Sequence, residues 1–124
     1  MDDLINSCDR ALRALFGVKK CNRPNPSIGA SESKLSEQER AHVSGLMRVN
    51  HTGEICAQAL YEGQALLART PEAKASLLDA AEEESDHLSW CRSRLDELNA
   101  APSLLNPLFY SASFAIGAAA GAFG

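Results

Sequence analysis

Several sequence patterns are missing from this chain of 124 residues, and each missing pattern disfavours a class of function. Its lysines and arginines are scattered, with only Lys19 and Lys20 adjacent, so we see no basic patch for binding nucleic acid. The four cysteines form no C-x-x-C pair, which disfavours a zinc site and suits a reducing compartment better than a disulfide framework. The N-terminus lacks the long apolar core of a secretory signal. The length allows at most one modest domain.

Charged residues are missing after Glu97. Pro102 and Pro107 interrupt the start of this uncharged tract, and we expect residues 108–124 to be helical. A helix of that length spans about 25 Å, slightly short of a membrane crossing of about 20 residues. Residues 117–121 read G-A-A-A-G, a spacing of small residues that lets another helix approach closely. We therefore predict a third bundle helix that touches lipid, in preference to a transmembrane span.

The N-terminal third of the sequence divides into a helix and a linker. Residues 1–20 carry an amphipathic helical pattern with a positively charged border, over about residues 3–20. Such a helix can lie on an anionic membrane surface, and the alternative is that it packs on its own domain. Residues 21–35, with two prolines and a glycine, are predicted to be a linker. Residues 36–124 then form the main helical domain.

Two long helices are predicted to open this domain. Residues 36–39 (Ser-Glu-Gln-Glu) are a capping-box pattern and begin a helix that runs to about Arg69. Thr70 and Pro71 supply the N-cap and the first helical position of a second helix, which runs to about Asn99. A connection this short makes the two helices antiparallel neighbours.

The candidate metal-binding residues are Glu54 on the first predicted helix and the pair Glu84 and His87 on the second. An unpartnered carboxylate within the apolar stripe around Glu54 would be costly. The E-x-x-H spacing places Glu84 and His87 on one side of their helix, and both glutamates lie at similar distances from Thr70. A carboxylate opposite an E-x-x-H is one half of a di-iron or di-manganese site, although a hairpin with paired buried polar groups fits the same spacing. The opposite face is predicted to be solvated: Glu82, Glu83 and Asp86.

Two other histidines and one tyrosine are the remaining candidates for this site. Glu39 and His42 share the E-x-x-H spacing, but Glu39 lies too far along the helix from Glu54 to join its site, and capping explains it. His51, one turn before Glu54, is a ligand candidate. We favour a group that supports the ligands by hydrogen bonding, or a core histidine with its own partner. Tyr61 is a second supporting candidate.

Three stretches together closely resemble the demethoxyubiquinone hydroxylase family of ubiquinone biosynthesis, in its proteobacterial branch. They read LMRVNHTGEICAQALY (46–61), EEESDHLSW (82–90) and PSLLNPL (102–108). The resemblance covers nearly the whole chain and implies an all-α, ferritin-like helix bundle with a di-iron centre. Residues 36–124 would supply its first antiparallel helix pair and the start of a third helix. In that family the positions that match Glu54, Glu84 and His87 ligate iron, with Glu84 bridging the two ions.

The resemblance further implies an oxidoreductase, a monooxygenase that uses O₂ to hydroxylate the ring of a demethoxyubiquinol. The substrate would be a polyprenylated quinol held in the membrane, and a complete site would hold two Fe ions. The implied location is peripheral, at the cytoplasmic face of a bacterial cell membrane, and other proteins of ubiquinone biosynthesis are implied partners.

The sequence departs from the family in one respect. The second carboxylate and second E-x-x-H of the family are absent, because the histidines are His42, His51 and His87 alone. We therefore expect a fragment of a longer protein, in preference to a half-site completed by a second copy. By itself it is expected to be unstable and without hydroxylase activity. Two alternatives stay open: an iron- or peroxide-handling bundle of the ferritin or rubrerythrin type, and a metal-free membrane-associated hairpin in which Glu54 pairs with His87.

Overall fold

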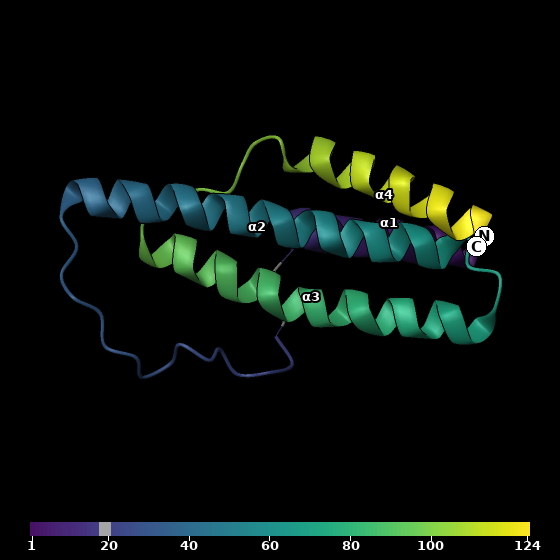
Figure 1. Cartoon of the computed structure of the whole chain (residues 1–124), viewed down its shortest axis with the longest axis horizontal. Helices are drawn as coiled ribbons and strands as arrows, with labels where there is room; N and C mark the ends of the chain where they lie inside the picture. Colours follow the sequence, from purple (N-terminus) through teal and green to yellow (C-terminus); the bar gives the residue numbers. More distant parts are fainter. Residues whose placement is uncertain (18–20) are drawn as a thin grey trace.

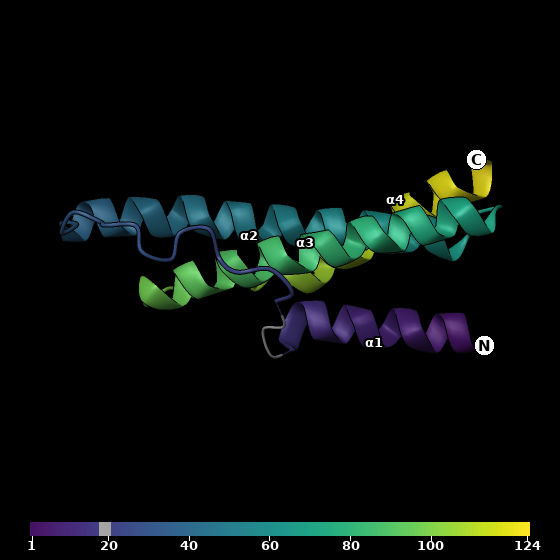
Figure 2. The same cartoon turned by 90° about the horizontal axis from the view of Figure 1, so that it is seen from below.

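The computed structural model describes residues 1–17 and 21–124, and the regular secondary structure of these residues is entirely α-helical. Figure 1 shows the second helix lying between the third and the fourth, and Figure 2 shows the first helix running along one side of the other three. The all-α, ferritin-like class predicted from the sequence is confirmed. The helices are α1 (Asp2–Phe16), α2 (Glu37–Leu66), α3 (Pro71–Glu97) and α4 (Asn106–Phe123).

The long helices start where the capping signals predict. The Ser36 hydroxyl accepts the backbone N–H of Glu39 at 3.2 Å, and the Glu39 carboxylate accepts the backbone N–H of Ser36 at 2.8 Å. This reciprocal pair is the capping box of α2. Thr70 caps α3 through the backbone N–H of Ala73, and Pro71 takes the first helical position. The short connection between them makes α2 and α3 antiparallel, as predicted (Figure 1).

The other ends of the long helices differ from prediction by a few residues. α2 ends at Leu66, three residues before Arg69, and α3 ends at Glu97, two residues before Asn99. Asn99 has a φ of 54°, in the left-handed region, and the backbone N–H of the next residue returns to the Leu95 carbonyl at 2.8 Å. Asparagine tolerates this conformation better than most residues, and it closes the last turn of α3.

α4 packs against α2 through glycines on both helices. A Cβ atom added at Gly117 would collide with the main-chain carbonyl of Leu60, and one added at Gly121 would collide with that of Gln64. Gly63 on α2 stands equally close to the carbonyl of Phe114. The predicted close approach of another helix at the G-x-x-x-G spacing is therefore confirmed, and the other helix is α2. α4 begins at Asn106, two residues earlier than predicted.

α1 packs on the rest of its own chain, which was one of the two alternatives. Its partly buried residues Ala11, Ala14 and Leu15 lie against a core formed by α2, α3 and α4. Arg10 Nε forms an ion pair of 2.6 Å with Glu62, whose side chain is only 1% exposed. α1 ends at Phe16, and the predicted helical residues 18–20 lie outside the described residues. The buried core contains Ile55, Ala59, Leu88 and Tyr110.

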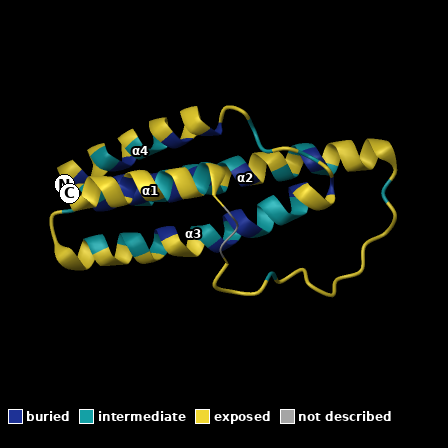
Figure 3. Cartoon of the chain, turned by 180° about the vertical axis from the view of Figure 1, so that it is seen from behind, coloured by how far each residue is buried: buried dark blue, intermediate teal, exposed yellow. Residues whose placement is uncertain are grey.

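Much of α4 is exposed, as the yellow colouring in Figure 3 shows, and many of its exposed residues are apolar. Within the part of the chain that the structure describes, no helix has both the length and the apolar character needed to cross a bilayer. The large exposed apolar residues along and just before α4 are Leu104, Leu105, Leu108, Phe109, Ile116 and Phe123.

Candidate metal centre

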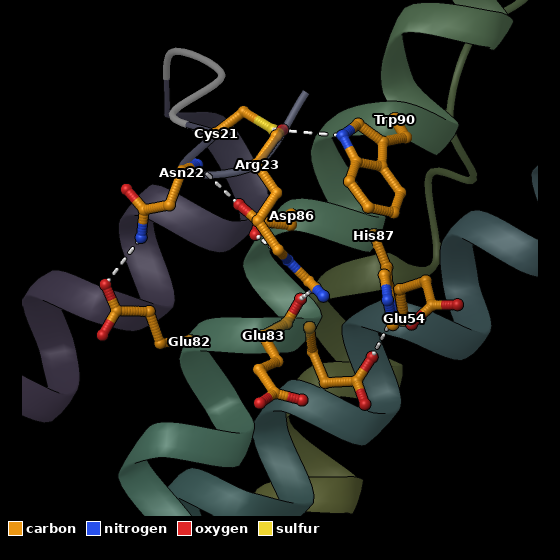
Figure 4. A network of polar contacts seen from close by, with 10 residues as sticks. Cys21, Asn22, Arg23, Glu54, Glu82, Glu83, Asp86, His87 and Trp90 are labelled. Atoms are coloured by element: carbon orange, nitrogen blue, oxygen red, sulfur yellow. Dashed lines mark hydrogen bonds and ion pairs between the residues drawn. The ribbon is translucent and has the colours of Figure 1, made fainter. Parts of the chain in front are cut away.

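The structure brings together the three residues that the sequence predicts to bind metal. Glu54 projects from α2, and Glu84 and His87 project from α3, where the i,i+3 spacing places them one turn apart. One ligand atom from each residue lies within 4.8 Å of the others. His87 Nδ1 lies 3.0 Å from Glu84 Oε2 and 3.6 Å from Glu54 Oε2. Figure 4 shows the Glu54 and His87 side chains meeting between the two helices.

The electrostatics of this cluster favour a cation. The pKa of Glu54 is raised to about 7, first by burial and then by the hydrogen bond and the negative charge of Glu84, while His87 opposes the shift. Two carboxylates this close cannot both ionise cheaply without a positive charge between them. Carboxylate oxygens and an imidazole nitrogen form a donor set that suits iron and manganese. The three residues therefore fit the cation that the sequence predicts, although their metal binding stays a prediction.

His51 lies apart from this cluster. Its side chain is 4% exposed, and its Nδ1 atom lies 3.3 Å from the Asn106 side-chain nitrogen at the start of α4. Burial, followed by the charge of Arg92, lowers the pKa of His51 to about 4, so the ring is neutral at pH 7. The structure thus places His51 as a core histidine that joins α2 to α4. Tyr61 is half-buried further along α2, and its supporting role stays a prediction.

Asp86 is the one clear error in the predicted solvated face of α3. Its side chain is buried, and its carboxylate accepts the backbone N–H of Asn22 at 2.7 Å and Arg23 Nε at 2.8 Å. Burial by itself raises the pKa of Asp86, but these hydrogen bonds outweigh it and lower the pKa. The linker covers this carboxylate, which helical periodicity within α3 cannot reveal. Glu82 and Glu83 are exposed, as predicted.

The most buried side of α2 is also displaced from the predicted stripe. Helical spacing in the sequence predicts a stripe of Val43, Met47, Glu54, Ala57, Tyr61, Ala65 and Ala68. Of these Ala65 is buried, whereas the other buried positions include His51, Ile55, Gln58, Ala59 and Glu62. The cause is α1 and α4, which cover this side of the helix. A cavity of about 520 Å³ lies between α1, α2 and α3, and the described residues that line it include none of the three cluster residues.

The fold and the cluster together define a ferritin-like helical protein in which two helices bring two carboxylates and an imidazole together, a donor set that suits a metal ion. Residues 33–124 match the family model described as ubiquinone biosynthesis protein COQ7, and the chain belongs to that family.

Curated relatives of the chain are named 3-demethoxyubiquinol 3-hydroxylase. The one from Ralstonia pickettii is 56% identical over 135 residues, which cover 100% of this chain and 62% of that protein. The one from Burkholderia cenocepacia is 54% identical over 125 residues, with 100% and 60% covered. The one from Pseudomonas fluorescens is 53% identical over 122 residues, with 98% and 57% covered. The chain therefore spans about three-fifths of the length of these relatives. No solved structure matches it.

Proposed function

We propose that this chain supplies one half of a di-iron centre that hydroxylates the ring of 3-demethoxyubiquinol with O₂ in ubiquinone biosynthesis. The observation that carries the proposal is the convergence of Glu54, Glu84 and His87 from two helices. It occurs in a chain of the COQ7 family whose relatives are named for this hydroxylation. A two-metal site needs two such halves, so a second carboxylate and a second E-x-x-H must come from another segment or another chain.

The three side chains have distinct roles in this proposal. Glu84 lies beside His87 on α3 and close to Glu54 on α2, so all three side chains would hold iron, and the resemblance to the hydroxylase family implies that Glu84 would be the carboxylate shared between the two ions. Bound iron would supply the activation of O₂. Because the pKa of Glu54 is raised to about 7, its proton leaves when a cation binds near neutral pH. Metal affinity should therefore rise with pH up to about 7.

We propose a polyprenylated quinol as the substrate, held at the cytoplasmic face of the cell membrane by peripheral contact. The exposed apolar residues of α4, among them Phe109 and Ile116, support this contact because an apolar surface of this kind is typical of membrane or protein interaction sites. α1 supports it less well, since Arg10 is used in the internal ion pair with Glu62. Other proteins of ubiquinone biosynthesis are further partners in this proposal.

The first test is an anaerobic Fe²⁺ titration of the chain and of two single-residue variants. Glu84→Gln removes the bridging carboxylate and should abolish iron binding. Glu83→Gln changes the neighbouring exposed glutamate and should leave iron binding unchanged. Iron affinity that survives Glu84→Gln would show that the site assignment is wrong.

The second test separates the hydroxylase from a ferritin- or rubrerythrin-type protein. The iron-loaded protein, as isolated from the cells that make it, is supplied with O₂ and a short-tailed demethoxyubiquinol. A hydroxylase inserts one oxygen atom into the quinol ring, and an excess of the same quinol supplies the two electrons and two protons that convert the other oxygen atom to water, itself becoming a quinone. O₂ is then consumed only with the quinol present, and the product is a quinol one oxygen atom heavier. Oxidation of added Fe²⁺ without any change in the quinol would contradict the proposed reaction.

A further inference from the structure

The linker is held against α3 beside the candidate ligands, and one of its anchors there is the buried carboxylate of Asp86. We call residues 21–32 the strap. Both Asp86 oxygens accept hydrogen bonds from it, Oδ1 from the backbone N–H of Asn22 at 2.7 Å and Oδ2 from Arg23 Nε at 2.8 Å. The Asn22 side chain also donates to Glu82 at 2.8 Å, one turn earlier on α3. Asp86 directly precedes His87, so the strap is fixed to the turn of α3 that carries a candidate ligand.

Cys21 and Arg23, at the same end of the strap, also contact Trp90, which lies one turn further along α3. The Arg23 guanidinium carbon lies 5.4 Å from the centre of the Trp90 ring, and Trp90 Nε1 lies 3.0 Å from Cys21 Sγ. The centre of the Trp90 ring lies 5.3 Å from that of the His87 imidazole, with the two planes tilted by 46°. Figure 4 shows the sequence of contacts from Arg23 and Cys21 through the indole to the imidazole. The strap therefore reaches His87 through one aromatic ring.

We propose that the strap positions the His87 imidazole for metal binding by fixing Asp86, the residue before it on α3, and Trp90, one turn after it. The His87 side chain is 39% exposed, so burial alone leaves its ring considerable rotational freedom. An indole held in place by Arg23 and Cys21 blocks rotamers that would turn the imidazole away from Glu54 and Glu84. A ligand that is already ordered loses less conformational entropy when the metal binds. Arg23 and Trp90 are positioning residues in this proposal, and neither touches the metal.

The effect on metal binding rests on the proposed function. The ordering of the His87 side chain does not, because it can be measured without metal. The match to the COQ7 family model begins at residue 33, so Cys21, Asn22 and Arg23 lie outside it. The ordering therefore depends on a segment outside the residues that match the family model.

The experiment uses NMR of the metal-free chain to measure χ1 couplings and relaxation of His87, with circular dichroism as a check of folding. Arg23→Gln removes the guanidinium from Asp86 and Trp90, and Trp90→Ala removes the indole. Both should change His87 from one dominant rotamer to rapid averaging. Glu32→Gln is the matched control, because it removes the ion pair with Arg94 at the other end of the strap and should leave His87 ordered. If Arg23→Gln does not fold, Trp90→Ala alone decides.

A Co²⁺ titration gives the consequence for the metal, followed through the d–d absorption bands. Arg23→Gln and Trp90→Ala should weaken Co²⁺ binding by about tenfold, the usual effect of removing a group that orients a ligand. Equal His87 order and equal Co²⁺ affinity in all variants would overturn the positioning role and leave the proposed metal site intact. In a third outcome the His87 side chain is ordered in the parent chain and disordered in both variants, and none of the three proteins binds Co²⁺. This would support the positioning role and count against metal binding by this half-site.

Discussion

Three buried or half-buried carboxylates in this chain have different partners, and the difference indicates where a cation is needed. Asp86 faces the Arg23 guanidinium, and its pKa is lowered. Glu62 faces Arg10, although burial still raises its pKa. Glu54 faces another carboxylate, Glu84, and the His87 imidazole, and its pKa rises to about 7. A metal at Glu54 would supply the positive charge that an arginine supplies to the other two.

The raised pKa of Glu54 predicts a pH dependence of stability. Between pH 4.5, the ordinary pKa of the group, and pH 7, the folded chain binds more protons than the unfolded chain. The free energy of unfolding therefore falls as pH rises through this window, by about 1 kcal/mol, because partial exposure weakens the full linkage effect. Glu54→Gln should remove this part of the slope in urea unfolding at the two pH values without metal. Glu62 gives a slope of the same sign, which the variant should keep. An unchanged slope would show that Glu54 titrates normally.

The ion pair of Arg10 with Glu62 predicts a strong effect of removing one partner. Arg10→Ala leaves the buried Glu62 carboxylate without its cation, and we expect the free energy of unfolding at pH 7 to fall by about 3 kcal/mol. The loss should be smaller at pH 4.5, because Glu62 can then be protonated. Arg13→Ala is the control on the same helix, since among the described residues Arg13 pairs with the exposed Asp9, and this change should affect stability little. Equal effects of the two changes would contradict the role given to Glu62.

At the scale of the elements, α2 organises the fold because the other three helices all pack against it. Its contact with α3 places the candidate ligands opposite one another, and its contact with α4 uses glycines in place of large side chains. Main-chain atoms then meet across that interface, where little can move to make room. Packing of this kind tolerates added volume poorly.

This packing predicts opposite effects for two glycine-to-alanine changes. Gly117→Ala places a methyl group against the Leu60 carbonyl and should destabilise the chain by about 1–3 kcal/mol. Gly45→Ala, inside α2 with nothing within 4 Å of the added Cβ, should stabilise it by up to about 1 kcal/mol through higher helix propensity. Urea unfolding with an unchanged m-value measures both effects. Stabilisation by Gly117→Ala would show that α4 does not pack closely on α2.

In the whole molecule, the candidate metal ligands and the exposed apolar residues lie on different surfaces of the described chain. The cluster side chains are partly exposed, by 27% for Glu54, 19% for Glu84 and 39% for His87, which leaves room for ligands from a second half-site. The large apolar surface lies elsewhere, along α4. Chemistry at the α2–α3 contact and lipid contact at α4 would then involve separate parts of one chain.

The apolar surface of α4 predicts binding to vesicles. Wild-type chain should float with vesicles of phosphatidylethanolamine and phosphatidylglycerol. The double change Phe109→Ser and Ile116→Ser should weaken this partition more than tenfold, given the transfer free energy of two large apolar side chains. Ile28→Ser, which removes an exposed apolar side chain from the linker, is the control and should have little effect. Equal flotation of all three proteins would exclude α4 as the lipid contact.

Features that depend on neighbours along the chain could be predicted from the amino-acid sequence. The caps at Ser36 and Thr70 and the grouping of Glu54 with Glu84 and His87 follow from helical spacing and from one short turn, so local periodicity is enough to predict them. Contacts between distant segments, such as those of Arg10 with Glu62 and Arg23 with Asp86, could be seen only in the folded chain. These pairs are separated by 52 and 63 residues. A buried acidic residue and an exposed one look the same in a helical pattern, and only the packing of α1 and the strap against the bundle distinguishes them.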